Sequence, residues 1–368
     1  SFLEDRNGWH GKPLKEEELG RALGEIGPMP EIDSKKYVRP PSRALKPRFR
    51  QELAWDRTAY TGPTATRLAY GIALEKLGRV NEWVVALDGD VKNSTYAEKF
   101  FEAFPERSFQ CYIAEQNMVG MGMGLSAKGF IPFMATFAAF LSRAHDQIRM
   151  AGYSFANLKF CGSHAGVSIG EDGPSQMGLE DMAIFRPIPG CVVLYPCDAY
   201  STEGCVAAMV RHKGLSYIRT TRPATPLLYG REEIFDVGGS KVLKKEPGDV
   251  ATVIAAGITV FEALKAWEEL RKEGVSIRVI DAYSVQPLDQ ETITREVTET
   301  GGRAIVVEDH FPGGGLGDAV ASALAGRSRL IHLSIRDLPR SGKPGELMDL
   351  YGISARHIIK AVKALIAN

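Results

Sequence analysis

The sequence predicts an α/β protein built from two doubly wound, mostly parallel sheets that follow an extended N-terminal linker. From residue 64 onward, short apolar runs alternate with stretches of helical periodicity, which is typical of a parallel sheet covered by helices on both faces. The alternation pauses at residues 229–239 and starts again near Asp249, which indicates a second sheet domain. With 368 residues, 44% of them hydrophobic, the chain can bury about two or three ordinary cores.

Residues 1–60 are predicted to be a tail and linker without a core of their own. They are polar and rich in proline and arginine, and only residues 16–26 have the periodicity of a helix. The predicted first domain then spans residues 61–235, and the predicted second domain spans residues 236–368.

Each predicted domain has its own series of elements. In the first, the apolar runs predict strands at 83–87, 111–114, 130–135, 158–161, 191–195 and 216–220, with helices at 65–77 and 140–150. In the second, the predicted strands are 250–255, 276–280, 304–307 and 330–335, and the predicted helices are 260–272, 290–298, 316–325 and 357–366.

Composition argues against nucleic-acid and membrane proteins. Forty-five basic residues balance forty-five acidic ones, and no basic stripe stands out. No apolar stretch approaches the roughly 20 residues that span a bilayer, and the N-terminus lacks a signal-peptide pattern. The five cysteines, odd in number and set in apolar segments, predict reduced thiols in a cytoplasmic protein. None of their spacings is that of a zinc site.

Glu115 is the most informative single residue, because it ends the apolar run 111–114 and opens a helical stretch at 116–127. Gly120, Gly122 and Gly124 lie within that stretch, although each glycine costs a helix about 1 kcal/mol relative to alanine. They indicate close approach by another backbone or by a cofactor. The alternative is an ordinary acidic residue that complements the helix dipole.

Polar groups follow several predicted strands, at the edge of the sheet where α/β proteins bind ligands. Asp88, Gly89 and Asp90 precede Ser94 after one strand, and residues 162–176 after another are rich in Gly, Ser, His and carboxylates. His164 lies eight residues from Asp172 in this loop, which favours proton transfer or hydroxyl binding.

Two arginines flank the same predicted edge. Arg67 opens the first core helix and Arg222 follows the strand 216–220, and a guanidinium fork suits a phosphate group. They therefore suggest a phosphorylated small substrate, although two surface arginines would give the same pattern. Phe137 and Phe140 follow another strand, and ordinary helix packing would explain them as well.

In combination, these segments closely resemble transketolase, a thiamine diphosphate enzyme. The resemblance runs in order through nearly the whole chain: Trp9-His10-Gly11-Lys12-Pro13-Leu14, Asp88-Gly89-Asp90, Ala114-Glu115-Gln116-Asn117-Met118, Thr136-Phe137-Ala138-Ala139-Phe140, Gly162-Ser163-His164 through Gln176, Arg219-Thr220-Thr221-Arg222-Pro223, Val307-Glu308-Asp309-His310 and Pro339-Arg340-Ser341-Gly342-Lys343-Pro344. The chain resembles the C-terminal portion of a transketolase: the end of the diphosphate-binding domain, the pyrimidine-binding domain and the C-terminal domain.

The resemblance implies a role for each candidate residue. It implies that Glu115 hydrogen-bonds the aminopyrimidine of thiamine diphosphate from an apolar pocket, and that His164 and His10 handle the proton of the donor hydroxyl. It further implies that the cofactor is contacted by Phe137, Phe140, Gln176 and His10. The substrate phosphate would be bound by Arg67, Ser94 and Arg222, and the sugar hydroxyls by His164 and Asp172.

The implied activity is transfer of a two-carbon ketol unit from a ketose phosphate to an aldose phosphate. The Gly-Asp-Gly motif followed by Asn that binds Mg²⁺ and diphosphate in the family does not occur in this sequence. The resemblance therefore implies that the Mg²⁺ ligands and the upstream domain belong to a partner chain or domain. It also implies self-association through the pyrimidine-binding and C-terminal domains, as a dimer, or as a heterotetramer if the enzyme is split.

Other functions remain open. One alternative is a related thiamine enzyme with another acceptor, of the dihydroxyacetone synthase or deoxyxylulose phosphate synthase type, although Arg67 and Arg222 with the loop 162–176 favour transketolase. Another alternative is a non-catalytic assembly module. Asp309, His310 and the turn at Gly313, Gly314 and Gly315 follow the strand 304–307, where they could bind a ligand or serve an interface or packing.

Overall fold

The first described helix and the two sheets belong to different units of the chain. The computed structural model describes residue 2, residues 13–28 and residues 55–367, which belong to two units, Ser1–Leu45 and Lys46–Asn368. In the first unit, α1 (Glu16–Ile26) forms where the periodicity predicts it, and its first turn carries Glu16, Glu17 and Glu18, which complement the helix dipole. His10 and most of the predicted linker lie outside the described residues.

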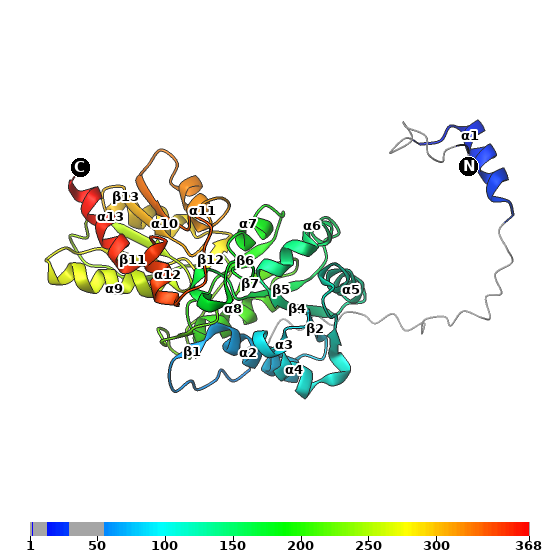
Figure 1. Ribbon diagram of the computed structural model, residues 1–368, viewed down its shortest axis with the longest axis horizontal. Coiled ribbons are helices and arrows are strands. Elements are labelled where there is room, and N and C mark those ends of the chain that lie inside the picture. The colour runs from blue at the N-terminus through cyan, green and yellow to red at the C-terminus, as the bar shows by residue number, and fades with distance from the viewer. Residues whose placement is uncertain (1, 3–12, 29–54, 368) are drawn as a thin grey trace. The chain divides into compact units, whose positions relative to one another are not determined.

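The second unit contains a sheet of seven strands in the order β12-β6-β7-β5-β4-β2-β3 (Figure 1). Its strands are β2 (Val84–Asp88), β3 (Ser108–Gln110), β4 (Ile131–Phe137), β5 (Lys159–Ser163), β6 (Val192–Leu194), β7 (Ser216–Arg219) and β12 (Ser284–Gln286). Every pairing is parallel except that of β12 with β6. Helices therefore cover both faces, and the central strands read as continuous apolar runs.

The faces of this sheet are covered by different helices. The connecting elements are α2 (Thr66–Val80), α3 (Lys92–Thr95), α4 (Glu98–Ala103), η1 (Pro105–Arg107), α5 (Glu115–Ala127), η2 (Ala139–Ala144), α6 (His145–Tyr153), η3 (Val167–Asp172), α7 (Asp181–Phe185) and α8 (Ala199–Arg211). Val84 and Ala86 pack with residues of α2 and α8, whereas Val85 and Leu87 pack with residues of α5 and α6. This alternation follows from the two-residue period of a strand. A small pair, β1 (Thr64–Ala65) and β8 (Ala224–Thr225), lies beside the start of α2.

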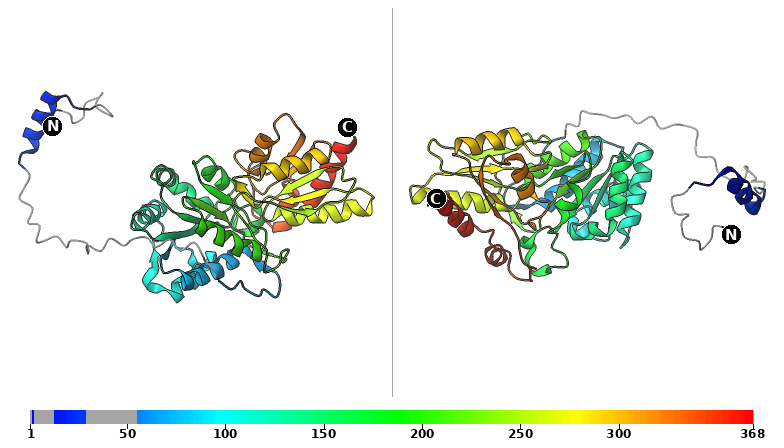
Figure 2. Two further views of the ribbon diagram at one scale, coloured as in Figure 1. Left: turned by 180° about the vertical axis from the view of Figure 1, so that it is seen from behind. Right: turned by 90° about the horizontal axis from the view of Figure 1, so that it is seen from above.

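A second sheet has five strands in the order β14-β13-β10-β11-β9. Its part of the chain is coloured from yellow to orange in Figure 2. Its strands are β9 (Lys241–Lys244), β10 (Thr252–Ala255), β11 (Arg278–Asp281), β13 (Arg303–Val307) and β14 (Arg329–Leu333), and only β9 runs antiparallel. Its helices are α9 (Thr259–Lys272), α10 (Gln290–Glu299), α11 (Leu316–Ala323), α12 (Pro344–Leu350) and α13 (Ala355–Ala367). The predicted α/β class with two mostly parallel sheets is therefore confirmed.

Two details of the predicted elements are wrong. Residues 111–114 do not form a strand: the strand at that point is β3, which ends at Gln110, and Tyr112 has a φ of +54° that interrupts the extended backbone. The predicted helix 140–150 begins instead with the 3₁₀ turn η2 and becomes α-helical at His145. The domain limits stay a prediction, and β12, from the later part of the chain, completes the edge of the first sheet.

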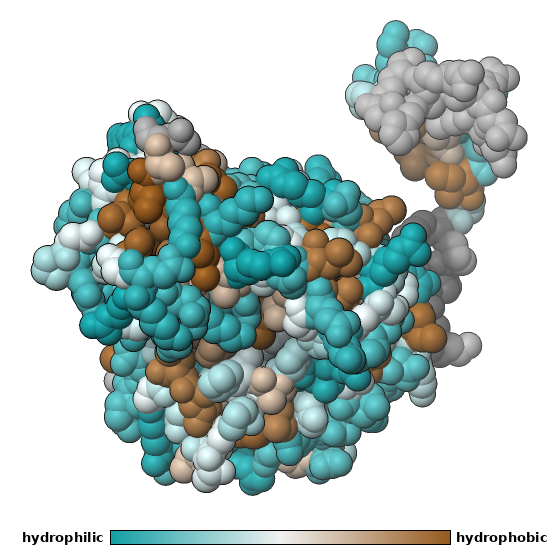
Figure 3. Space-filling model, turned by 60° about the vertical axis from the view of Figure 1, so that its left-hand side comes forward, coloured by the Kyte–Doolittle hydropathy of each residue, from teal (hydrophilic) through white to brown (hydrophobic). Residues whose placement is uncertain are grey.

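The surface drawn in Figure 3 is mainly hydrophilic, with hydrophobic residues in small groups among the others. In the described part of the chain, no helix combines the length and the apolar character needed to cross a bilayer. All five cysteines are buried and unpaired.

Candidate functional site

A cavity of about 340 Å³ lies at the carboxyl ends of the first sheet's strands. Seven side chains from five separate segments line it: Arg67, Ser94, Phe137, His164, Asp172, Gln176 and Arg222. Each of them is a residue that the sequence singles out. The fold therefore brings together residues that are up to 155 positions apart (222 minus 67) in one pocket.

The wall that carries Ser94 is held by a buried carboxylate. Asp88, the last residue of β2, accepts hydrogen bonds from the backbone N–H of Val91 (2.7 Å) and the hydroxyl of Thr95 (3.2 Å). Burial raises the pKa of Asp88 to about 6, although these donors oppose the shift. The short helix α3 is fixed in this way, and Arg67 Nη1 donates to the Ser94 carbonyl at 2.8 Å. Asp88 therefore supports the pocket without lining it.

His164 directly follows β5 and has a left-handed backbone with φ of +56°. Its ring stacks on Phe137 with 3.9 Å between the centroids, and Ser163 Oγ lies 3.0 Å from its Nδ1. Burial, together with the charges of Arg67 and Arg222, lowers the pKa of His164 to about 3. The imidazole is therefore neutral at pH 7, so it can donate one hydrogen bond and accept another.

Asp172 and Arg222 form the charged side of the pocket. Arg222 Nη1 lies 3.3 Å from Asp172 Oδ2 and donates to the Ile169 carbonyl at 3.1 Å. Asp172 Oδ2 also lies 3.9 Å from His164 Nε2. The pocket thus offers two guanidinium groups beside a carboxylate and a neutral imidazole, a set suited to a ligand that has both a phosphate group and hydroxyl groups.

Glu115 opens α5, as predicted, and is only 3% exposed. Its surroundings differ from the expected apolar pocket, because Arg143 Nη1 lies 3.0 Å from Glu115 Oε2 and 2.8 Å from the Ile113 carbonyl. Arg143 and Phe140 both belong to η2, and Phe140 stacks on Phe137 with 5.1 Å between the centroids. Glu115 therefore does not line the cavity, but it contacts the same turn that carries its aromatic wall.

Arg143 is a residue that the sequence analysis missed. Its position three residues after Phe140 places both on one short helical turn, which was the available signal.

The three glycines of α5 differ in their surroundings. A Cβ on Gly122 would lie 2.6 Å from Met134 Sδ, whereas one on Gly120 or Gly124 would meet no described atom within 4 Å. The expected close approach within the described residues applies to Gly122 alone.

The glycine turn of the second sheet is occupied by the chain itself. The buried carboxylate of Glu308 accepts the backbone N–H groups of Leu316 (2.6 Å) and Gly317 (3.0 Å) at the start of α11, and His332 Nε2 lies 2.5 Å from it. This arrangement satisfies the donors that an anionic ligand would use.

Within residues 13–28 and 55–367, no three His, Cys, Asp or Glu side chains group as metal ligands.

Two mostly parallel sheets with a polar cavity at one carboxyl edge define an α/β ligand-binding protein. Comparison with known families is more specific. Residues 63–226 match the transketolase pyrimidine-binding domain, and residues 240–358 match the transketolase C-terminal domain.

Individual relatives agree with these matches. Transketolase-like protein 2 of Mus musculus is 47% identical over 372 residues, which are 98% of this chain and 58% of the relative. Transketolase of Homo sapiens is 45% identical over 380 residues, which are 100% of this chain and 60% of the relative. The chain therefore spans about 60% of the length of these curated relatives.

Solved structures support the same assignment. One described as split gene transketolase, inactive beta4 tetramer, is 37% identical with a TM-score of 0.75, and the match covers 83% of this chain and 99% of that one. Transketolase from Campylobacter jejuni has a TM-score of 0.73 at 21% identity, covering 88% of this chain and 50% of that one, a likeness that concerns the fold alone. The chain belongs to the transketolase family.

Proposed function

We propose that this chain is the pyrimidine-binding half of a transketolase, which transfers a two-carbon ketol unit from a ketose phosphate to an aldose phosphate. The observation that carries the proposal is the cavity at the strand ends, because it unites two arginines with a neutral imidazole and a carboxylate. Arg67, Arg222 and Ser94 would bind the substrate phosphate. His164 and Asp172 would bind the sugar hydroxyls, where a neutral imidazole can accept a hydroxyl proton.

The remaining residues are assigned to the cofactor. Glu115 would hydrogen-bond the aminopyrimidine, with Phe137 and Phe140 packed against that ring and Gln176 beside it; the buried carboxylate next to the stacked aromatic pair fits this assignment. Thiamine diphosphate, when bound, supplies the nucleophilic carbon and the electron sink. His10, which lies outside the described residues, would contact the diphosphate, and the Mg²⁺ ligands are assigned to the upstream domain.

The proposed active form needs a partner that carries the upstream diphosphate-binding domain. The split gene relative named above supports a separate subunit of this extent, since the match covers 99% of that chain. The surface beside Glu115 also suits another chain, because Tyr112 and Ile113 are 69% and 70% exposed and Gly120 and Gly124 face open space among the described atoms. Self-association through the two sheet domains would give a dimer, or a heterotetramer with separate upstream chains.

The direct test is ketol transfer from xylulose 5-phosphate to ribose 5-phosphate with thiamine diphosphate and Mg²⁺. It compares the chain alone with the chain mixed with a separately produced upstream domain, with light scattering used to show that the mixture assembles. We expect transfer only in the mixture. Assembly without transfer would contradict the proposal; transfer to formaldehyde in place of ribose 5-phosphate would indicate the dihydroxyacetone synthase type, and no transfer to either would indicate a non-catalytic module.

A further inference from the structure

Asp309 connects the second sheet to the pocket of the first. It follows β13 and is fully buried, yet its carboxylate faces the loop 164–176, which we call the substrate loop. Oδ1 accepts the backbone N–H of Val167 at 2.7 Å, and Oδ2 accepts that of Ser168 at 3.2 Å. These are the first two residues of η3, the turn that ends at Asp172. A buried carboxylate is costly unless it is hydrogen-bonded, so these contacts hold the loop firmly.

The loop has no spare room at this point. Gly166 has φ of +85°, and a Cβ there would overlap Asp309 Oδ2. On the other side of the loop, a Cβ on Gly170 would lie 2.9 Å from Pro344 Cδ, and one on Gly173 would lie 2.6 Å from Ser341 Oγ. Residues from the later part of the chain therefore enclose the substrate loop from two directions.

The backbone of Asp309 is itself fixed by a buried arginine. Arg219, at the end of β7, donates through Nη2 to the carbonyls of Gly178 (2.7 Å) and Asp309 (2.8 Å), and its Nε lies 2.8 Å from Asp181 Oδ2. Gly178 in turn accepts the backbone N–H of Gly166 at 2.8 Å, which closes the base of the loop. Arg219 thus connects the base of the substrate loop to Asp309, the residue whose side chain holds the first turn of that loop.

The held turn leads directly to the pocket. Ile169 follows Ser168, and its carbonyl accepts the hydrogen bond of Arg222 Nη1 at 3.1 Å. Asp172, at the end of the same turn, lies 3.3 Å from Arg222 through Oδ2. Glu171 of this turn also lies 3.3 Å from Arg222 Nη1 through Oε2. A shift of Val167 and Ser168 would therefore move the groups of the turn that orient the Arg222 guanidinium.

We infer that Asp309 is a positioning residue of the sugar phosphate pocket, through which the second sheet sets the place of Asp172 and Arg222. The identity of the ligand rests on the proposed function; the control of the substrate loop by Asp309 does not. An ångström-scale misplacement of binding groups from a distance is enough to weaken binding strongly. We expect loss of the Asp309 carboxylate to weaken sugar phosphate binding at least about tenfold.

The first test compares D309N with D318N. Asn places an N–H group against one of the two backbone donors, whereas Asp318 is exposed, accepts the backbone N–H of Gly314 and touches no residue of the substrate loop. The affinity of the chain for ribose 5-phosphate is measured by calorimetry, and backbone protection by hydrogen exchange. D309N should bind at least about tenfold more weakly and lose protection in peptides covering 164–176, with other peptides unchanged; D318N should match the wild type.

A second pair keeps Asp309 and changes the loop instead. G166A pushes a methyl group toward the carboxylate. Gly27 has nearly the same backbone, with φ of +74° and ψ of −178° against +85° and +171° at Gly166, and a Cβ there would meet no described atom within 4 Å. Alanine is strained at both positions, because this combination of positive φ and extended ψ is essentially confined to glycine, so the difference between G166A and G27A reports the contact with Asp309. G166A should weaken ribose 5-phosphate binding and G27A should not. This pair decides the matter if D309N does not fold.

The inference fails if folded D309N keeps wild-type affinity and loop protection, or if G166A and G27A bind alike. It also fails if D309N loses protection evenly over the whole chain, because that result would make Asp309 a general stability residue. A wild-type chain that binds no sugar phosphate, even when assembled with the upstream domain, would contradict the proposed function, and hydrogen exchange of D309N would still decide the role of Asp309.

Discussion

The imidazole of His164 lies nearly flat on the phenyl ring of Phe137, with 3.9 Å between their centroids and 21° between their planes. Phe137 also stacks on Phe140, so the three rings form a continuous wall from the cavity to the turn that holds Arg143. This wall removes one face of the imidazole from water, and the charges of the Arg67 and Arg222 guanidinium groups also lower the pKa of His164. The stack therefore fixes both the orientation of His164 and its neutral state.

His164 should stay neutral in the folded chain from about pH 8 down to about pH 5, because its pKa is lowered to about 3 by burial and then by Arg67 and Arg222. Imidazole nitrogen shifts measured by NMR would show this. The unfolded state takes up the proton near pH 6.5. This group therefore stabilises the fold above that pH, and the stabilisation is lost as pH falls toward 3. R67M should raise the pKa of His164, and a wild-type titration near pH 6.5 would contradict the prediction.

Phosphate recognition should depend on both pocket arginines. A hydrogen bond to a charged group contributes about 1.5–3 kcal/mol, so R67M and R222M should each weaken ribose 5-phosphate binding roughly 10- to 150-fold. Binding of unphosphorylated ribose should change much less. R79M is the control, since Arg79 is exposed and paired with Glu75 at 2.6 Å. Equal losses for both sugars would show that the arginines do not contact the phosphate.

Glu115 should matter for ketol transfer and not for sugar phosphate binding, because it contacts Arg143 and does not line the cavity. E115Q keeps the shape and removes the charge. In the reconstituted mixture we expect transfer to fall at least about a hundredfold, the usual scale for loss of an acid–base group. Calorimetry with ribose 5-phosphate should give wild-type affinity. The exposed Glu102 provides the control variant E102Q, and full activity of E115Q would remove Glu115 from the mechanism.

The pocket was predictable because its residues follow strand ends, and the ends of parallel strands meet at one edge. Arg67, His164 and Arg222 could thus be placed near one another before any contact was known. Arg143 and Asp309 were not recognised as parts of the site. Their effects depend on contacts across 28 and 142 residues of sequence, which periodicity does not report. The expected strand at 111–114 failed for a local reason, the positive φ of Tyr112.

Asp281 should make the stability of the chain pH-dependent. This last residue of β11 is fully buried, and burial raises its pKa to about 7 although Tyr229 and Cys197 donate to it. Because the folded pKa exceeds the unfolded value near 3.9, the contribution is present below about pH 4 and is lost as pH rises to about 7. D281N should therefore be more stable than wild type at pH 8 in urea unfolding, with less advantage at pH 4. Asp337 is exposed, so the stability of D337N relative to wild type should not change between pH 4 and pH 8.

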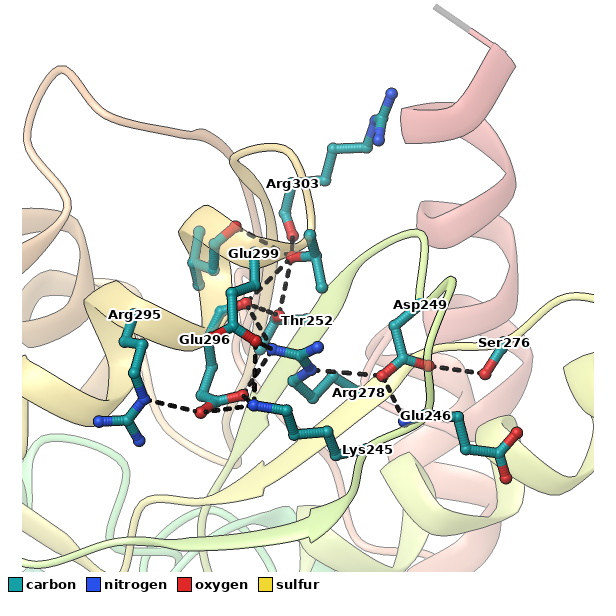
Figure 4. A network of polar contacts seen from close by, with 12 residues as sticks. Lys245, Glu246, Asp249, Thr252, Ser276, Arg278, Arg295, Glu296, Glu299 and Arg303 are labelled. Carbon is teal, nitrogen blue, oxygen red and sulfur yellow. Dashed lines mark hydrogen bonds and ion pairs between the residues drawn. The ribbon is translucent and has the colours of Figure 1, made fainter.

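A charged network in the second sheet domain joins β11 to α10 (Figure 4). Arg278, the first residue of β11, is 5% exposed; its Nε lies 3.3 Å from Asp249 Oδ2, and its Nη1 lies 2.5 Å from Glu296 Oε2 and 2.8 Å from Glu299 Oε2. Asp249 and Glu296 have side chains only 0% and 2% exposed, and Arg278 is the buried cation that both of them contact.

R278M should therefore destabilise the fold by about 3–5 kcal/mol, because it leaves two buried carboxylates without their buried partner. Lys245 and Arg295, which are 44% and 48% exposed, would still contact Glu296, and this moderates the loss at that residue but not at Asp249. Urea unfolding should show a lower midpoint with an unchanged slope. K272M removes another cation paired with a glutamate, but that pair is 68% and 55% exposed and the midpoint should not move. Equal midpoints for R278M and K272M would show that the network contributes to geometry without contributing to stability.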